Sequence, residues 1–258
     1  MSGAIDRDGL ELARRLTEAR STRVPVPRPT NLASTMARAV RRRCIEILTN
    51  EGSIPIAGYK VSLSTPTWGA LTDKVVLTSG ASLPRRALID PLLEGELAFV
   101  VETELSPSST LADIVDGCSV APAIEIADSR WEGWHPSAPA RFVVPSGAEI
   151  EADNAVSGWL VLGESWAPAR ELPLPELQIS MRTNGRTVAR GVLQVAMGHP
   201  AEAVRWLIEQ LAADGRSLDV GQVVSSGCPY TEPVTVTPAG GTWEAVVEEI
   251  GAASVTFT

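Results

Sequence analysis

The sequence predicts one α+β domain: a helical N-terminal arm over residues 1–53, followed by a mixed, mostly antiparallel β-roll core over residues 54–258. Two segments near the N-terminus repeat apolar residues at helical spacing, whereas the chain beyond residue 54 breaks into short β-like runs. These runs are bounded by Gly, Pro, Asn or Ser and do not alternate regularly with helices. With 258 residues, 44% of them apolar, the chain can bury enough surface to fold without disulfides or structural metals.

The arm is predicted to contain two helices. Residues 6–20 repeat apolar side chains near helical spacing, and residues 31–49 form a second such segment with Asn31 as the expected N-cap. Residues 24–30 between them read VPVPRPT, and their alternate prolines cannot donate the amide hydrogen bonds of a helix.

The core is predicted to consist of short strands interrupted by helices over residues 108–115 and 200–213. The dipeptide Asn184-Gly185 indicates a tight hairpin, because it favours the two-residue turn that joins antiparallel strands. The β-like runs are IPIAGYKVSLS (54–64), ELAFVVETEL (96–105), VAPAIEIADS (120–129), GWLVLGES (158–165), LQISMRT (177–183), RTVARGVLQV (186–195), QVVSSG (222–227) and SVTFT (254–258).

Composition excludes several classes of protein. A formal net charge of −9 offers no basic face for phosphates, so we expect no binding to nucleic acid. No run approaches the roughly 18 apolar residues of a membrane span, and the first residues do not resemble a signal peptide. We therefore expect no membrane association and a cytoplasmic location. Three well-separated cysteines exclude a disulfide framework and a CxxC zinc site, and two histidines exclude a three-histidine metal site.

Three carboxylates form a candidate metal site. Glu94 and Glu96 lie on one face of an extended strand, and Glu125 lies inside another apolar run. Carboxylates without histidine partners suit a hard divalent cation, Mg²⁺ or Mn²⁺. Spacing leaves alternatives open, because Glu125 could instead face solvent from an edge strand. Two other acidic clusters compete on composition, Glu102 with Glu104 and the trio Glu149, Glu151 and Asp153.

Lys60 is unusual because it is one of only two lysines and lies inside an apolar strand. A strand lysine usually protects an edge or extends to solvent. Beside a carboxylate cluster it could instead hold a substrate anion or move a proton. His199 immediately precedes a predicted helix, where we expect it to cap or pack against the helix start.

Taken together, six motifs resemble the 2-keto-4-pentenoate hydratase / 4-oxalocrotonate decarboxylase family, within the fumarylacetoacetate hydrolase-like superfamily. They occur in the family's order across some 200 residues, and their combination is specific although each motif alone is weak. The motifs are AGYKVSLS (57–64), LEGELAFVV (93–101), APAIEIADSR (121–130), ADNAVSGWLVLG (152–163), MGHPAEAVRWL (197–207) and the C-terminal stretch from GQVVSSG (221–227) to GAASVTFT (251–258).

The resemblance implies a fumarylacetoacetate hydrolase-like β-roll, a homo-oligomer and a site for Mg²⁺ or Mn²⁺. The family's metal motif falls on Glu94, Glu96 and Glu125, and its active-site lysine falls on Lys60. The further residues expected to contact the substrate are Trp68, as an apolar wall, and Asn154, Ser157 and Ser226.

The implied substrate is a 2-oxo acid, or its 2-hydroxydienoate tautomer, that chelates the metal and reacts through a stabilised enolate. Water addition would make the protein a hydratase, loss of carbon dioxide a decarboxylase, and simple reprotonation a tautomerase. Two alternatives from other classes are a hydrolase of C–C bonds in acylpyruvate-like substrates and a non-catalytic family member.

Three departures from the family pattern fall near the expected substrate. Thr67 stands where the family carries an acid that helps to activate water or shuttle protons, and a threonine hydroxyl is no base near neutral pH. Val156 replaces the serine that usually follows the ADNA motif, and the segment HPSAPARFVVPSGAEIE (135–151) is longer than expected. The metal chemistry is expected to be retained, while the loss of the acid favours decarboxylation or tautomerisation over water addition.

Overall fold

The computed structural model describes residues 5–62, 66–195, 197–230, 234–237 and 239–258. In this part of the chain the α-helices are α1 (Arg7–Thr22), α2 (Ser34–Leu48), α3 (Leu111–Asp116), α4 (Gly147–Ala152) and α5 (Ala201–Ala213). The strands are β1 (Ile56–Ser62), β2 (Thr67–Thr72), β3 (Val76–Thr78), β4 (Ala81–Leu83), β5 (Leu92–Val101), β6 (Cys118–Ala127), β7 (Ser157–Leu162), β8 (Ala167–Pro168), β9 (Gln178–Thr183), β10 (Arg186–Val192), β11 (Val223–Ser225), β12 (Val234–Thr235), β13 (Gly241–Val247) and β14 (Gly251–Phe257). None of these helices is long and apolar enough to cross a bilayer.

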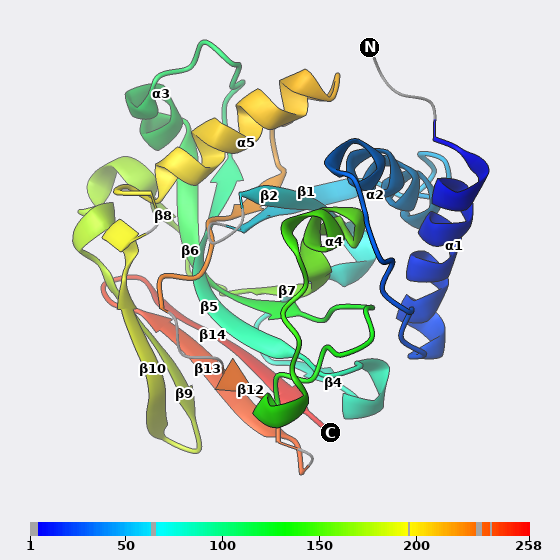
Figure 1. The fold of residues 1–258 in the computed structure, drawn as a ribbon. Helices are drawn as coiled ribbons and strands as arrows, with labels where there is room; N and C mark the ends of the chain where they lie inside the picture. Colours follow the sequence, from blue (N-terminus) through cyan, green and yellow to red (C-terminus); the bar gives the residue numbers. More distant parts are fainter. Residues whose placement is uncertain (1–4, 63–65, 196, 231–233, 238) are drawn as a thin grey trace.

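Two sheets form the core (Figure 1). Within the described residues the larger sheet has nine strands, in the order β2-β1-β11-β5-β6-β7-β3, with β12 beside β5 and β8 beside β6. The smaller sheet has the order β10-β9-β13-β14-β4. Among the described strand pairs, only β1–β11, β3–β7 and β4–β14 are parallel. The mixed, mostly antiparallel core predicted from the sequence is therefore confirmed.

Strand alternation gives the larger sheet two different faces. On β5, Leu93, Leu97 and Phe99 enter the apolar core, which packs against α5 and the smaller sheet. Glu94 and Glu96 alternate with these residues and lie on the opposite face. We call this second face, which also carries Glu125, the carboxylate face.

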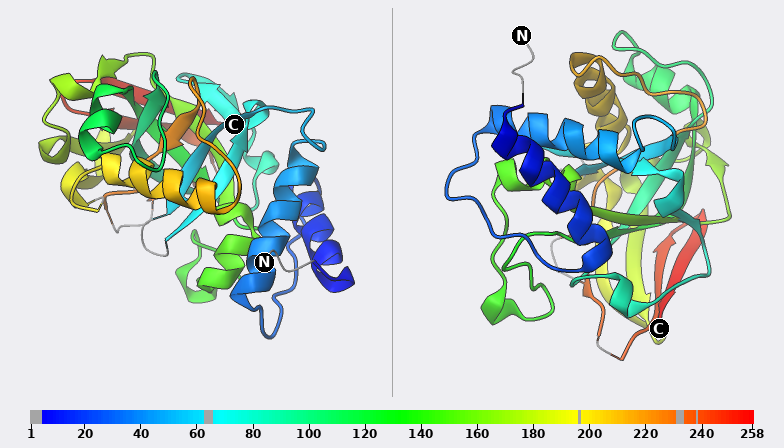
Figure 2. Two further views of the ribbon diagram at one scale, coloured as in Figure 1. Left: turned by 90° about the horizontal axis from the view of Figure 1, so that it is seen from above. Right: turned by 90° about the vertical axis from the view of Figure 1, so that its right-hand side faces the viewer.

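The N-terminal arm packs against one side of the larger sheet (Figure 2). Asp6 begins α1 by accepting a hydrogen bond from a backbone amide of the first turn at 2.9 Å. The two helices α1 and α2 bury a cluster that includes Leu16 and Trp131. The predicted N-cap at Asn31 is wrong, because α2 begins after Ala33 and has no side-chain cap.

Two elements beside the carboxylate face were not predicted. Strand β2 is buried along its whole length, so it lacks the alternation that marks a half-exposed strand. Helix α4 begins with a capping box, in which the Ser146 hydroxyl and the Glu149 carboxylate each accept the other residue's backbone amide. The hairpin at Asn184-Gly185 is confirmed, since both residues have positive φ and join β9 to β10. Residues 63–64 of the first predicted β-run and Thr65 lie outside the described residues.

Candidate active site

The pairing of β5 with β6 brings three glutamates together. Glu94 lies directly opposite Glu125, and Glu96 follows two residues along β5 on the same face. One carboxylate oxygen from each glutamate lies within 4.8 Å of those of the other two. The pattern Glu-x-Glu before an apolar run thus becomes a cluster because β5 and β6 are neighbours in the sheet.

Two of these carboxylates are deeply buried, and each has an oxygen without a hydrogen-bond partner. The Oε2 atom of Glu96 accepts a hydrogen bond from the Ser225 hydroxyl and another from the Gly227 amide at 2.9 Å. Among the described residues, no donor reaches Oε1 of Glu96 or Oε2 of Glu125. A buried carboxylate oxygen without a partner costs several kcal/mol, so this donor set fits a hard divalent cation.

Lys60 supplies a positive charge at the same place. It lies on β1, whose neighbour β11 separates it from β5, and its ammonium reaches across to the carboxylate face. Its Nζ atom is 2.7 Å from Oε1 of Glu125 and donates a hydrogen bond to the Ala155 carbonyl at 3.2 Å. Lys60 and Glu125 therefore form a buried ion pair, with side chains 3% and 1% exposed.

Burial and charge shift the proton affinities of these groups. Burial alone lowers the pKa of Lys60, but the three neighbouring carboxylates outweigh it and raise the pKa above its ordinary value. Burial raises the pKa of Glu96 well above its usual range and that of Glu125 to about 7, since desolvation outweighs the attraction of Lys60. Without a cation, Glu96 and Glu125 therefore hold protons more tightly than exposed carboxylates do.

A left-handed turn positions the carbonyl that holds Lys60. Asn154, Ala155 and Val156 have φ values of 50°, 54° and 51°. The turn lies so close to β2 that a Cβ atom at Gly69 would be 2.2 Å from the Asn154 carbonyl oxygen. Only glycine permits this approach, so Gly69 and the ADNA motif together bring the Ala155 carbonyl to Lys60.

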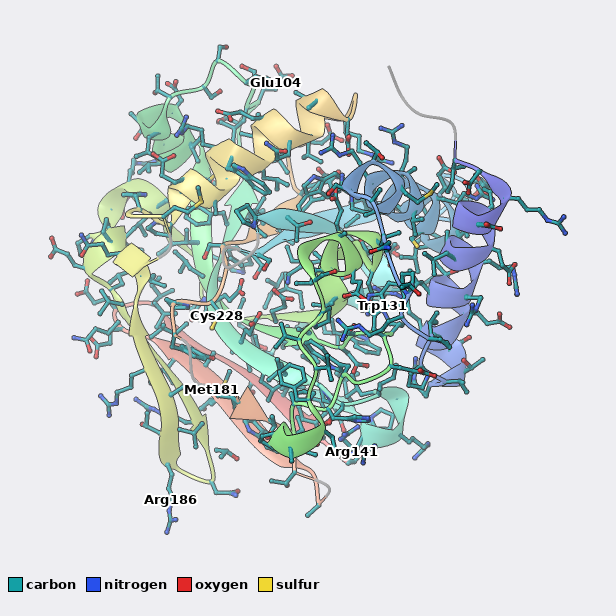
Figure 3. All side chains as sticks on the ribbon, in the orientation of Figure 1. Glu104, Trp131, Arg141, Met181, Arg186 and Cys228 are labelled. Atoms are coloured by element: carbon teal, nitrogen blue, oxygen red, sulfur yellow. The ribbon has the colours of Figure 1, made fainter. Side chains whose placement is uncertain are left out.

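A cavity of about 310 Å³ opens beside this cluster. Its polar end is lined by Lys60, Ser62, Glu94, Cys228 and Tyr230. Cys228 lies next to β5 in Figure 3, and the Tyr230 hydroxyl accepts a hydrogen bond from the Gly95 amide at 2.5 Å. The remainder of the lining is mostly apolar. The cavity therefore has a charged end and an apolar end.

Thr67 and Trp68 lie on opposite faces of β2. Thr67 pairs with Ser62 on the side of Lys60, and its buried hydroxyl has no hydrogen-bond partner among the described residues. Trp68 instead packs edge-on against Tyr59 in the core, with the ring centroids 5.6 Å apart. The predicted role of Trp68 as an apolar wall beside the substrate is therefore wrong, because strand alternation turns its side chain away from Lys60.

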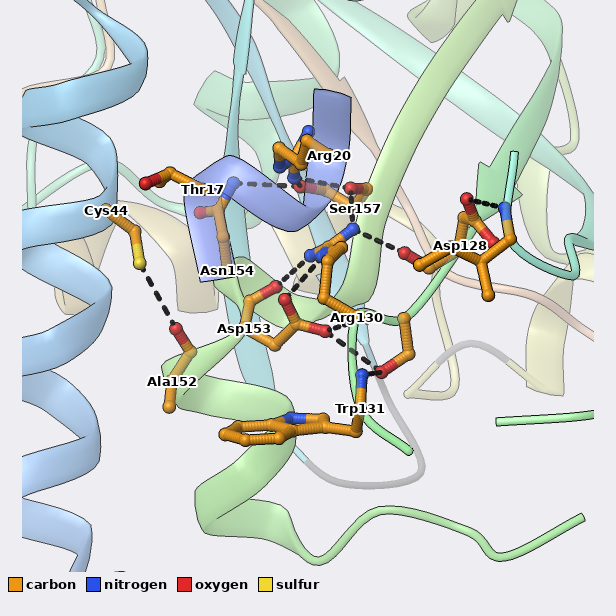
Figure 4. A network of polar contacts seen from close by, with 12 residues as sticks. Thr17, Arg20, Cys44, Asp128, Arg130, Trp131, Ala152, Asp153, Asn154 and Ser157 are labelled. Atoms are coloured by element: carbon orange, nitrogen blue, oxygen red, sulfur yellow. Dashed lines mark hydrogen bonds and ion pairs between the residues drawn. The ribbon is translucent and has the colours of Figure 1, made fainter. Parts of the chain in front are cut away.

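Asn154 and Ser157 belong to a buried polar network rather than to the cavity lining (Figure 4). The Asn154 amide bonds both the N–H and the carbonyl of Ala70 at 2.9 Å, and it donates to the Ser157 hydroxyl at 2.8 Å. Arg20 donates to the same hydroxyl at 2.8 Å. The side chains of Asn154 and Ser157, which were expected to contact the substrate, instead make these hydrogen bonds within the protein. Both residues therefore hold β2 and the left-handed turn in place.

Ser226 does not reach the carboxylates in this structure. Its amide donates to the Leu97 carbonyl at 3.0 Å, and its buried hydroxyl has no hydrogen-bond partner in the described part of the chain. The preceding residue, Ser225, contacts Glu96 instead. The sequence VVSSG could have predicted that only one of the two serines lies on the carboxylate face, because side chains alternate between the two faces along β11.

The rival acidic clusters have other partners. Glu149 pairs with Arg28 at 2.6 Å, and Asp153 pairs with Arg130 at 2.5 Å, as the network in Figure 4 shows for the second pair. Glu151 lies 3.3 Å from an Arg41 nitrogen. Glu102 accepts a hydrogen bond from Ser119, and Glu104 is exposed. The structure thus neutralises the trio with arginines and leaves the carboxylate face as the candidate metal centre.

Comparison with known proteins shows the family to which the chain belongs. The model of the fumarylacetoacetate (FAA) hydrolase C-terminal domain matches residues 59–258. A 2-hydroxyhexa-2,4-dienoate hydratase of Comamonas testosteroni is 33% identical over 202 residues, which cover 77% of this chain and 72% of that protein. A 2-keto-4-pentenoate hydratase of Paraburkholderia phymatum is 28% identical over 265 residues, which cover 96% of both proteins.

A solved structure is similar over almost the whole chain. This is 4-oxalocrotonate decarboxylase from Pseudomonas putida G7, complexed with magnesium and adipate, with a TM-score of 0.86, 25% identity and coverage of 99% of each chain. Its fold confirms the predicted fumarylacetoacetate hydrolase-like β-roll with a helical N-terminus. The chain therefore belongs to the fumarylacetoacetate hydrolase family, and its relatives include the hydratases and decarboxylase that its sequence motifs indicated.

Proposed function

We propose that this chain is a metal-dependent lyase of the hydratase or decarboxylase type, acting on a 2-oxo-alkenoate or its 2-hydroxydienoate tautomer. The observation that carries the proposal is the cluster of Glu94, Glu96 and Glu125 beside Lys60, at the charged end of a cavity. We also propose that the ion is Mg²⁺ or Mn²⁺, that the protein is a homo-oligomer and that it is cytoplasmic.

The three glutamates would hold the ion. Once bound there, it would supply a Lewis acid for the negative charge that develops on the substrate's 2-oxygen. Glu96 is oriented for this role, because Ser225 and Gly227 fix one of its oxygens and leave the other free.

Lys60 would hold the substrate's carboxylate or deliver a proton from its Nζ atom. Its raised pKa keeps the ammonium charged near neutral pH, and the Ala155 carbonyl fixes its direction. The substrate's anionic end would therefore bind at the charged end of the cavity, with its chain directed toward the apolar end.

Tautomerisation is a second candidate reaction, which the residue at position 67 favours. Water addition needs a base within about 3 Å of the attacking water, and the Thr67 hydroxyl cannot provide one. Protonation of an enolate needs only a donor, which Lys60 can be.

The experiment follows the ultraviolet absorbance of 2-hydroxypenta-2,4-dienoate after mixing with purified protein and Mg²⁺, with product analysis to separate hydration from tautomerisation. Consumption is expected to stop with EDTA, to return with Mg²⁺ or Mn²⁺, and to fall about 10²-fold or more in Glu125→Gln. The matched control Glu104→Gln, at an exposed glutamate, should behave like the unmodified protein. Failure to consume 2-hydroxydienoates and 4-oxalocrotonate with either metal would overturn the proposal and favour a non-catalytic family member.

A further inference from the structure

The end of the cavity away from Lys60 is built from hydrocarbon. The segment that follows β6 and helix α4 together cover this end, and β5, β6 and β12 close it from the other side. The apolar residues that line the cavity are Leu92, Leu93, Ala127, Trp134, Phe142, Val144, Pro145, Ile150, Val156 and Val234.

This wall is held in a fixed arrangement. The Trp134 indole donates to the Asp90 carbonyl at 2.7 Å, and its ring meets Phe142 edge-to-face with the centroids 5.3 Å apart. The Val143 amide donates to the Gly133 carbonyl at 2.8 Å, which closes the loop that carries Phe142. The segment that was longer than the family pattern predicted therefore forms much of the apolar wall.

No positive charge faces this end among the described residues, because Lys60 is the only cationic side chain that lines the cavity. The nearby arginines do not line the cavity. Arg28 pairs with Glu149 at 2.6 Å and donates a hydrogen bond to the Val144 carbonyl at 3.0 Å from outside the cavity lining. Arg141 is exposed at the turn Pro139–Arg141, where it contacts His135 (Figure 3). The residues that the structure does not describe include no lysine, arginine or histidine.

We infer that the distal half of the substrate is uncharged hydrocarbon, and that the site discriminates against a second, distal carboxylate. A carboxylate placed against this wall would lose its water without gaining a hydrogen-bonding or charged partner, which is unfavourable. A methyl or methylene group there is instead stabilised by burial. The preferred substrate class is thus a 2-hydroxydienoate monocarboxylate with no distal substituent or a short alkyl one. This inference rests on the proposed function, and it disfavours decarboxylation of a distal carboxylate.

A matched pair of unreactive ligands tests the inference. 2-Oxohexanoate and 2-oxoadipate have the same length and differ only in a terminal methyl group against a terminal carboxylate. Their dissociation constants for the Mg²⁺-loaded protein are measured by calorimetry. We expect 2-oxohexanoate to bind about 30-fold more tightly or better, which corresponds to roughly 2 kcal/mol. Equal or tighter binding of 2-oxoadipate overturns the inference but leaves the proposed function intact, whereas binding of neither ligand overturns both.

Two adjacent valines provide a variant and its control. Val144 lines the cavity, whereas Val143 does not, and both are exposed, at 67% and 53%. Val144→Arg should reduce the preference for 2-oxohexanoate at least about 10-fold by offering the distal carboxylate a partner, while Val143→Arg should leave the ratio unchanged. An unchanged ratio in Val144→Arg would show that the distal end of the ligand lies elsewhere, and would overturn the assignment of this wall.

Discussion

Replacing Lys60 with methionine removes the positive charge at the carboxylate face and keeps an unbranched side chain of similar length. In the folded protein, Glu94, Glu96 and Glu125 would then face one another without a counter-charge. Removing one partner of a buried ion pair costs about 3–5 kcal/mol. For a chain of this size, that loss lowers the melting temperature of the metal-free protein by about 6–10 °C.

The stability lost in Lys60→Met should depend on pH and on whether a divalent cation is bound. The pKa of Glu125 is about 7 in the folded protein, above the value of about 4.3 for an unfolded glutamate, so the folded state binds more protons and loses stability as pH rises between these values. Loss of Lys60 raises the folded pKa further. The difference in melting temperature between variant and unmodified protein should therefore widen from pH 6 to pH 9. It should narrow when Mg²⁺ replaces EDTA, because the ion supplies the missing positive charge.

The assay is thermal unfolding followed by circular dichroism, together with dienoate turnover, which should fall about 10²-fold or more. Lys74→Met is the control, because Lys74 is the other lysine and is exposed. If Lys60→Met melts with the unmodified protein in EDTA and turns over substrate at the same rate, the reasoning is refuted, and Lys60 has no role at the carboxylate face.

Three further predictions concern residues around the site. Thr67→Asp should hydrate 2-hydroxypenta-2,4-dienoate with Mg²⁺ at a higher rate than Thr67→Asn does. Rapid hydration by the unmodified protein would contradict the interpretation that Thr67 replaces the group that activates water. Asn154→Ala should lower the free energy of unfolding by about 2–4 kcal/mol in urea titrations, because it leaves both backbone groups of Ala70 unpaired; a loss under 1 kcal/mol would contradict the anchoring role. Burial tends to raise the pKa of Glu149, but Arg28 and the capping box outweigh it and keep this pKa below its usual range. Glu149→Gln should therefore lower the free energy of unfolding by about 1 kcal/mol at pH 7, and by progressively less as pH falls below about 4.3. A loss of stability that does not change with pH would contradict this prediction.

The candidate site could be predicted in part because its key residues lie on strands with clear alternation. Along β5, the positions of Glu94 and Glu96 between apolar residues indicate that both glutamates share a face. The sequence alone could not exclude Glu149, Glu151 and Asp153 as the metal site, because the arginines that neutralise them come from other parts of the chain. The capping-box pattern of Ser146 and Glu149 was nevertheless present, and it could have shown that this stretch is helical rather than extended.

The positions that sequence reasoning missed depend on contacts between distant segments. Strand β11 inserts between β1 and β5, and no local pattern specifies that order. Trp68 was placed on the wrong side because β2 is buried on both faces and has no visible alternation. Asn154 and Ser157 match the family motif, but a motif identifies a residue without showing whether it contacts substrate or holds a neighbouring strand.

Binding of Mn²⁺ to the metal-free protein reports on the carboxylate face itself, because it measures the metal site without requiring the right substrate. Free Mn²⁺ is followed by electron paramagnetic resonance during titration of the unmodified protein, Glu96→Gln and the exposed-site control Glu104→Gln. We expect one Mn²⁺ per chain that Mg²⁺ displaces, unchanged binding in Glu104→Gln, and affinity at least about 10-fold weaker in Glu96→Gln. Equal affinity in Glu96→Gln and the unmodified protein would contradict the claim that the carboxylate face holds the metal.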